Sequence, residues 1–268
     1  MVTNMKKQLI SIGLMGLIIS ALTGCNSAGK YNGDGKKYFA QGQYEEAADH
    51  FLKAIDKNPN RMDYYIDYGI NLIALGNYEE AIAQFDQAYR DKDVKVIKQN
   101  NKKLFRGKGI AYYYSKQYEK ALEQFDLALE INELSDLNVD ILYYKGNTLM
   151  AIGSYDLAAE IYSNILSKDE KDVSALLERA YCYQVLGAYE NALEDYNKVI
   201  SLDPNNYDGY FGKFSLLLEY GMNTEAAEVL AQAGAIEGDR PGDQYNKAKL
   251  HYYQGNFPWY CSAAPIFD

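Results

Sequence analysis

The sequence predicts an all-α protein, a solenoid of antiparallel helix hairpins with about six complete units and a partial seventh. Two observations lead to this fold class. Large side chains alternate with very small ones at helical spacing, in two runs separated by a short turn. The same arrangement then returns along nearly the whole chain, which is typical of repeat architectures.

The first hairpin is expected between Tyr31 and Pro59. Gly35 and Ala47 are small where two helices must lie close together, a turn falls at Gly42, and Pro59 ends the second helix. One hairpin cannot bury its own apolar face, so neighbouring hairpins should follow. Its pattern is carried by Tyr31, Gly35, Tyr38, Gly42, Tyr44, Ala47, Phe51, Ala54 and Pro59.

Six further copies follow the first. Their patterns begin with Tyr65 and Gly69, Phe105 and Gly109, Leu142 and Gly146, Leu176 and Ala180, Tyr210 and Leu217, and Gln244 and Ala248. The units start near residues 28, 62, 102, 139, 173, 207 and 241, so the steps are 34, 40, 37, 34, 34 and 34 residues. A base period of about 34 residues is that of the tetratricopeptide repeat. From about residue 28 to 257 the chain therefore resembles the tetratricopeptide repeat (TPR) family, which implies a right-handed superhelical solenoid.

Residues 1–24 have the features of a signal peptide that is removed. Lys6 and Lys7 precede an apolar run from Leu9 to Leu22, which is shorter than the roughly 20 residues that span a bilayer. The run ends in Leu-Thr-Gly-Cys at Cys25, which resembles the bacterial lipobox. That resemblance implies a covalent diacylglycerol lipid on Cys25; an uncleaved anchor with an incidental cysteine is the alternative. The chain is thus identified as similar to bacterial TPR-containing lipoproteins, extracytoplasmic and lipid-anchored to the membrane.

The expected organisation after cleavage has three parts. Residues 25–30 form the lipidated cysteine and a short tether, 31–257 the TPR solenoid, and 258–268 an irregular tail interrupted by Pro258 and Pro265. At about 3.5 Å per residue the tether reaches roughly 18 Å, so the first hairpin should lie almost on the bilayer. The tail could fold back, mark a truncated repeat or meet a partner.

Composition limits the partners. Without Lys6 and Lys7 the mature chain has 25 basic and 37 acidic side chains, a net charge of −12. This balance argues against nucleic acid, because no domain-wide basic surface exists to neutralise phosphates. Cys182 and Cys261 could pair in an oxidising compartment, but Cys182 falls on the inner side of a repeat helix, which favours a buried free thiol.

Two steps exceed the base period. About six residues are inserted near 91–101, in a Lys-rich stretch (Lys92–Lys103) where Lys95, Lys98 and Lys102 would share a face if the second-repeat helix is extended. This stretch is either a solvated helix end, with cations favourable at the C-terminal dipole, or a basic knob for lipid head groups or an acidic partner. About three residues near 132–137 lengthen a loop.

The family resemblance places a partner-binding groove on the first helix of each hairpin, at positions flanking the packing glycine. These positions form a mainly apolar and aromatic surface that suits an amphipathic helix or an extended peptide. Packing against a neighbouring repeat is the alternative for each position. The predicted groove residues are Ile66, Ile70, Arg106, Ile110, Tyr113, Tyr114, Tyr143, Asn147, Met150, Leu177, Tyr181, Gln184, Phe211, Tyr245, Lys249 and Tyr252.

No catalytic or cofactor signature is present in the sequence. His50 and His251 are far apart at repeat positions where packing is expected, and neither a nucleophile elbow nor a phosphate-binding loop occurs. The clamp that some TPR proteins use for C-terminal carboxylates is also not reproduced.

We therefore expect a non-enzymatic, membrane-anchored adaptor for a protein or peptide of the cell envelope, without cofactor, metal or nucleic acid. Similar TPR lipoproteins serve as assembly factors for envelope machines. A receptor for a small ligand or cell-wall fragment is the alternative.

Overall fold

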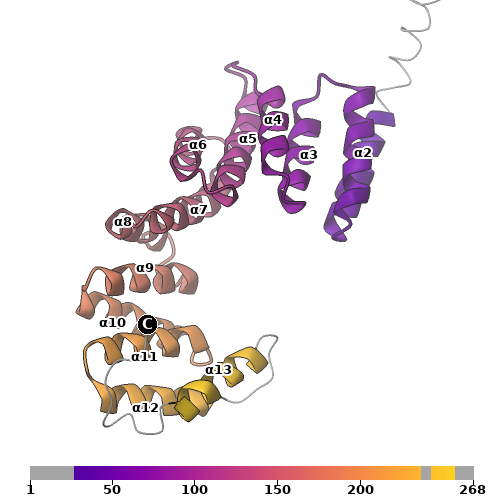
Figure 1. The fold of residues 1–268 in the computed structure, drawn as a ribbon. Helices are drawn as coiled ribbons and strands as arrows, with labels where there is room; N and C mark the ends of the chain where they lie inside the picture. The colour runs from indigo at the N-terminus through magenta and orange to yellow at the C-terminus, as the bar shows by residue number, and fades with distance from the viewer. Residues whose placement is uncertain (1–26, 237–242, 257–268) are drawn as a thin grey trace, which may run out of the picture. The chain divides into compact units, whose positions relative to one another are not determined.

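The computed structural model describes residues 27–236 and 243–256, and every regular element in these ranges is helical (Figure 1). The chain divides into two compact units, one up to Ile141 and one from Leu142 onward. The predicted all-α fold of consecutive helix hairpins is confirmed. The signal peptide, Cys25 and the tail 258–268 lie outside the described residues.

The first unit contains three hairpins. Its first helix covers residues 27–40, so residues 27–30, which were expected in a tether, are helical. A short 3-10 helix (Ser135–Leu137) precedes α7 (Asn138–Ala151), whose first residues belong to this unit. The remaining helices are α2 (Tyr44–Lys57), α3 (Met62–Ala74), α4 (Tyr78–Ala88), α5 (Lys95–Tyr114) and α6 (Tyr118–Glu130).

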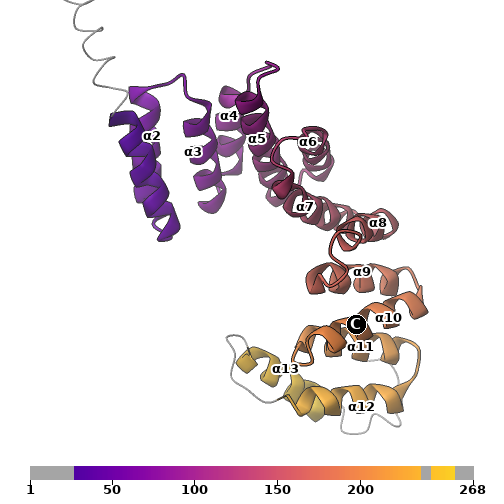
Figure 2. The same cartoon turned by 180° about the vertical axis from the view of Figure 1, so that it is seen from behind.

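The second unit continues the same alternation. In it α11 contacts α9, α10 and α12 (Figure 1, Figure 2). Its helices after α7 are α8 (Tyr155–Leu166), α9 (Val173–Val185), α10 (Tyr189–Leu202), α11 (Tyr207–Glu219), α12 (Asn223–Gly234) and α13 (Asp243–Asn256).

The turn inside a hairpin depends on one residue with positive φ. Gly76 has φ +80°, and the amides of Gly76 and Asn77 bond the carbonyls of Ile73 and Leu72 at 3.0 and 2.8 Å. This pattern satisfies the last carbonyls of α3 and reverses the chain. In the third hairpin Lys116 takes the same conformation, at φ 61°.

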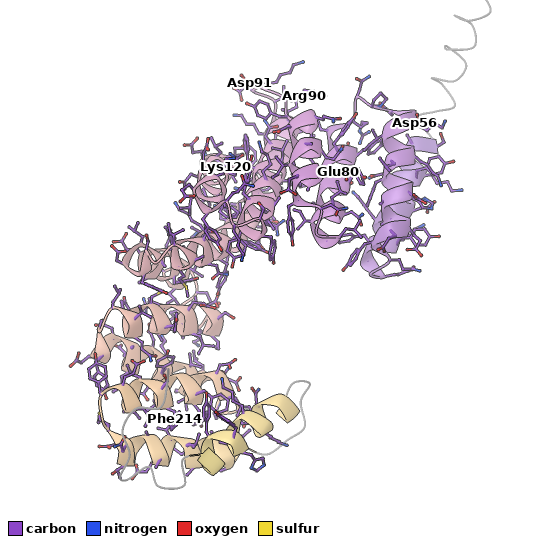
Figure 3. All side chains as sticks on the ribbon, viewed as in Figure 1. Asp56, Glu80, Arg90, Asp91, Lys120 and Phe214 are labelled. Carbon is purple, nitrogen blue, oxygen red and sulfur yellow. The ribbon has the colours of Figure 1, made fainter. Side chains whose placement is uncertain are left out.

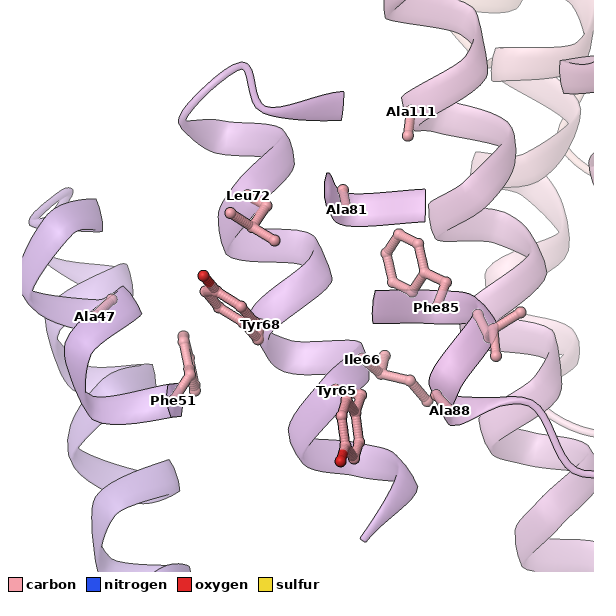
Figure 4. Close-up of a cluster of buried hydrophobic side chains, with 11 residues drawn as sticks. Ala47, Phe51, Tyr65, Ile66, Tyr68, Leu72, Ala81, Phe85, Ala88 and Ala111 are labelled. Carbon is pink, nitrogen blue, oxygen red and sulfur yellow. The ribbon is translucent and has the colours of Figure 1, made fainter. Parts of the chain in front are cut away.

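Close packing of a glycine against an aromatic ring joins the two helices of a hairpin. A Cβ on Gly69 would lie 2.7 Å from the ring of Phe85, and Phe85 is fully buried. Figure 4 shows Phe85 among the buried side chains contributed by α2, α3, α4 and α5. Gly35 with Phe51 and Gly146 with Tyr162 repeat the relationship, which confirms the predicted packing role of these glycines.

The inserted residues do not extend the second-repeat helix. That helix, α4, ends at Ala88, and α5 begins at Lys95. Of the two interpretations of this stretch, the one that places Lys95, Lys98 and Lys102 at a helix C-terminus is therefore wrong, because they lie in the first turns of α5. Lys102 is fully buried and so belongs to no exposed basic surface.

Candidate functional site

In the first unit, the predicted groove residues divide between packing and internal bonding. Ile66 and Ile110 are 2% and 6% exposed, so their assignment as partner contacts is wrong. They face the interior because the helix positions beside the packing glycine meet the neighbouring hairpin. Ile70 is half-buried against the same core. Arg106 forms an ion pair with Asp140.

Tyr113 and Tyr114 belong to an aromatic cluster at the turn end of α5. Tyr114 stacks on Tyr78 with centroids 5.8 Å apart, and Tyr113 meets Tyr118 at 6.0 Å. Tyr78 and Tyr118 begin α4 and α6. Of the two predicted residues, Tyr114 stays exposed to solvent.

Near the start of the second unit, three more predicted residues hold helices together. The Tyr143 hydroxyl donates a 2.6 Å hydrogen bond to Asp172 Oδ1, and the same oxygen accepts from the amide of Ala175 at the start of α9. The Tyr162 hydroxyl donates to Asn147 Oδ1 at 2.6 Å and lies 3.3 Å from the Met150 sulfur. Burial and the adjacent carboxylate of Asp172 raise the pKa of Tyr143, so its hydroxyl stays a donor at neutral pH.

A pocket of about 350 Å³ opens on the second unit. It brings together four predicted residues from three different first helices: Tyr181 and Gln184 on α9, Phe211 on α11 and Lys249 on α13. We call it the α9–α11–α13 pocket. Its other lining residues are Tyr196, Asp208, Gly212, Phe214, Ser215, Glu219 and Tyr253.

The floor of the pocket is aromatic. Phe211 is only 5% exposed, so only a small part of its ring is accessible from the pocket. The Lys249 ammonium lies 4.6 Å from the centroid of this ring and 5.9 Å from that of Tyr253, which is favourable for a cation. Phe214, labelled in Figure 3, contacts Tyr253 with centroids 5.3 Å apart.

A hydrogen-bonded wall fixes the polar side of the pocket. The Gln184 amide donates to Glu219 Oε1 at 2.8 Å and to Ser215 Oγ at 3.2 Å, while its oxygen accepts from the Tyr196 hydroxyl at 3.0 Å. Each polar group of Gln184 is therefore oriented by a neighbour. Tyr181 stands at the rim, 45% exposed and edge-on to Tyr155.

The remaining predicted residues lie around this pocket or outside the described side chains. Leu177 is half-buried against a small core formed by α9, α10 and α11. Tyr252 is 63% exposed beside Tyr253. Tyr245 lies in α13, but its side chain is outside the described residues.

Sequence reasoning did not include Asp208 and Glu219 in the groove. Both continue the helical series through Phe211 and Ser215 at spacings of three and four residues, so extending that face by one turn each way would have found them. Tyr253 carries the same signal, because it follows the predicted Lys249 by four residues on α13. Tyr196 carries none, because it lies on a second helix, α10, and reaches the pocket by its hydrogen bond to Gln184.

Chemistry within the described residues is limited. There, no group of three or more His, Cys, Asp or Glu side chains is arranged to hold a metal ion. Cys182 is a buried free thiol, as predicted, and burial raises its pKa to about 12, which makes it a poor nucleophile. His50 lies between Tyr31 and Tyr38, whereas His251 is exposed and not the packing residue that was expected.

The comparisons with known proteins identify the family. Tetratricopeptide repeat models match residues 35–94, 69–138, 106–169 and 173–206, more than half of the chain. The chain therefore belongs to the tetratricopeptide repeat family. Within the described residues, no helix is both long enough and apolar enough to cross a membrane.

Similar proteins carry the same repeat. Hsp70-Hsp90 organizing protein 3 of Arabidopsis thaliana is 26% identical over 69% of this chain and 38% of its own length, so the chain spans well under half of that relative. A TPR protein from Parabacteroides merdae has a TM-score of 0.65 at 19% identity, covering 87% of this chain and 89% of that one. YrrB, described as a TPR protein with an unusual peptide-binding site, has a TM-score of 0.56 at 23% identity over 75% of this chain and 99% of its own.

Proposed function

We propose that this protein is a non-enzymatic adaptor, lipid-anchored through Cys25 at the outer face of a bacterial membrane. It binds a peptide or helix of an envelope protein in the α9–α11–α13 pocket. The observation that carries this proposal is the pocket itself, whose aromatic floor and fixed polar wall come from three successive repeats. The family resemblance and the YrrB description support peptide binding as the class of interaction.

The pocket has the features of a recognition site for an amphipathic segment. An apolar side chain of the partner would enter over Phe211, and Tyr181 at the rim would cover it with a rigid aromatic surface. The carboxylates of Asp208 and Glu219 would meet polar groups of the partner, while Gln184 holds the Glu219 carboxylate in place. Because two carboxylates face one ammonium group, that of Lys249, a partner with a basic residue beside its apolar anchor fits best.

The carboxylate clamp of chaperone-binding TPR proteins does not fit this chain. Asn32 and Lys36 occupy the first clamp positions, and both bind the Asp67 carboxylate of α3, at 2.8 and 2.9 Å. Their hydrogen-bonding groups are thus directed to an internal carboxylate. The likeness to Hsp70-Hsp90 organizing proteins does not by itself make a chaperone tail the ligand.

The partner site is tested by crosslinking and pull-down from membranes. We would compare the lipidated wild type with a Tyr181→Ala, Lys249→Ala double variant and with a matched Leu157→Ala, Lys168→Ala control on exposed positions of α8 and the loop after it. The proposal requires at least one envelope protein that the wild type and control capture and the pocket variant loses. An identical set of captured proteins from all three would contradict it.

A small ligand is the second candidate, because about 350 Å³ lies within the range of small-molecule pockets. Capture of no protein, combined with a thermal shift on adding soluble wall fragments, would favour it. The anchor is tested separately: Cys25→Ser should move the protein from the membrane to the soluble fraction, and mass spectrometry of the wild-type N-terminal peptide should show the lipid.

A further inference from the structure

We infer that the inserted segment forms a second membrane contact, specific for anionic lipid head groups, that fixes how the first unit is oriented on the bilayer. We call residues 89–98, from the end of α4 to the first turn of α5, the α5 knob. The inference rests on the proposed lipid anchor for its geometry. It goes beyond that anchor, because a single attachment point leaves the orientation of the protein open.

The α5 knob projects from one edge of the first unit. Helix α5 has 20 residues and the corresponding α3 has 13. Their C-terminal ends, Ala74 and Tyr114, are 40 residues apart, which equals the repeat step between them, so the extra seven residues all lie at the N-terminal end of α5. At 1.5 Å per residue, α5 extends about 10 Å beyond the level at which α3 begins.

The edge from which the knob projects is also the anchored edge. Because the helices alternate in direction, the start of helix 27–40, the loop between α2 and α3, and the loop between α4 and α5 lie at the same edge of the first unit. Figure 1 shows the two loops at this edge, and Figure 3 shows Asp56 near the first and Arg90 and Asp91 at the second. Cys25 precedes residue 27 by two residues, which span at most about 7 Å. A membrane that holds Cys25 therefore lies within reach of the knob.

The apolar side chains of the α5 knob suit the membrane interface. Val94 and Val96 are 49% and 58% exposed, and Tyr89 is 43% exposed while its ring contacts Phe105. Exposed valine side chains are less favourable in water than in the apolar part of a bilayer interface. A Tyr that keeps one face on the protein and one in solvent is typical of the head-group region.

The charges of the α5 knob select an anionic surface. Residues 89–98 contain four basic and two acidic side chains, in a chain that is acidic overall. Asp93 is paired with Lys98 at 2.5 Å, and Lys102 is buried. The exposed side chains of Lys92 and Lys95 remain to meet lipid phosphates, and both lie at the positive end of the α5 dipole.

These features favour a bilayer over a protein partner. A protein interface would bury the knob's lysines, which are depleted at interface cores, whereas at a lipid surface they remain hydrated beside the phosphates. The acidic remainder of the chain is repelled by the same surface. Attraction at the knob and repulsion elsewhere together define one orientation of the first unit.

Hydrogen–deuterium exchange on tethered protein tests this inference. The chain from Cys25 to Asp268, with Cys261→Ser, would be coupled through Cys25 to maleimide lipid in vesicles of phosphatidylcholine with or without phosphatidylglycerol. This coupling supplies the anchor chemically, so the result does not depend on natural lipidation. Backbone amides of residues 89–98 should exchange at least tenfold more slowly on the anionic vesicles than on the neutral ones.

Two variants separate the surface charge from the fold. Lys92→Gln with Lys95→Gln should remove the slowing, since each lysine near an anionic surface contributes about fivefold in affinity. Lys116→Gln with Lys120→Gln, at the opposite edge of the same unit, should leave it unchanged. Equal exchange on both kinds of vesicle, or slowing that survives the Lys92 and Lys95 changes, would overturn the inference while leaving the lipid anchor and the pocket untouched.

Discussion

The ammonium group of Lys102 donates a 2.7 Å hydrogen bond to the carbonyl oxygen of Ile131, the residue that caps the C-terminal end of α6. A second bond of 2.6 Å reaches Asn138 Oδ1 at the start of α7. One buried cation thus ties α5 to the end of the next helix and to the longer loop that follows it. A cation at a helix C-terminus is favourable, which offsets part of the cost of burying the charge.

Replacing Lys102 by Met should destabilise the protein. The substitution keeps most of the side-chain volume but leaves the Ile131 carbonyl and the Asn138 amide oxygen without their buried donor. We expect the free energy of unfolding to fall by about 1–3 kcal/mol in chemical denaturation. Burial lowers the pKa of Lys102, so removing the charge recovers some free energy, and the loss should stay within this range.

The matched control for this change is Lys103→Met, because Lys103 is the exposed neighbour on the same helix. It should leave the stability within about 0.5 kcal/mol of the wild type. A Lys102→Met variant as stable as this control would show that the buried ammonium contributes nothing to joining α5 and α6.

Gly69→Ala should be strongly destabilising because its methyl group has no room. The added Cβ would lie 2.7 Å from Phe85, whose ring is fully buried and cannot move away cheaply. Overpacking of this kind reduces stability by about 1–3 kcal/mol, measured by thermal or chemical unfolding.

Gly33→Ala, on helix 27–40, should change the stability in the opposite direction. Nothing lies within 4 Å of a Cβ at this position, so only the helix propensity changes. Stability should rise by up to about 1 kcal/mol. If both glycine variants behaved alike, the contact between Gly69 and Phe85 would not be what holds α3 against α4.

The repeats could be predicted from the sequence because the residues that pack the two helices of a hairpin together lie within the same repeat, at a fixed spacing. The pairing of Gly69 with Phe85 is visible as a small residue followed sixteen positions later by a large one, and this pattern recurs in the first five hairpins. In the sixth hairpin Phe214 stands at the position of the small residue. Turn glycines such as Gly76 mark where the helices reverse. The residues that contact each other across a hairpin are also close in the sequence, so their spacing alone predicts the fold class.

The extended α5 and the pocket could not be predicted in the same way. From the sequence, Lys102 would be expected at the surface. Its burial is explained by the carbonyl of Ile131, which lies 29 residues away in the sequence. Ile66 and Ile110 sit at positions that family resemblance assigns to a groove, yet packing between repeats covers them. Exposure at such positions depends on neighbouring side chains, which repeat spacing does not specify.

Ionisation of Cys182 should make the protein less stable at alkaline pH. Burial raises the pKa of its thiol from 9.0 to about 12. Above pH 9 the unfolded chain therefore loses a proton that the folded chain keeps, and stability falls as pH rises through this window. At pH 10 the thiol should account for roughly 1 kcal/mol of lost stability.

The measurement is chemical denaturation of wild type and Cys182→Ala at pH 7 and pH 10. The alanine variant should be less stable at pH 7 because it leaves a small cavity, and this difference should shrink by roughly 1 kcal/mol at pH 10. Tyrosine ionisation acts on both proteins alike. A difference that stays constant between the two pH values would contradict a buried, protonated thiol.

Photocrosslinking from the rim of the α9–α11–α13 pocket tests the central proposal most directly. A photoreactive amino acid would replace Tyr181 in one preparation and Leu157, which is equally exposed on α8, in the other, each in the lipidated protein in its own membranes. We predict a discrete crosslinked partner from position 181, reduced by Lys249→Ala, and none from position 157. The same products from both positions, or none from position 181, would contradict binding in this pocket.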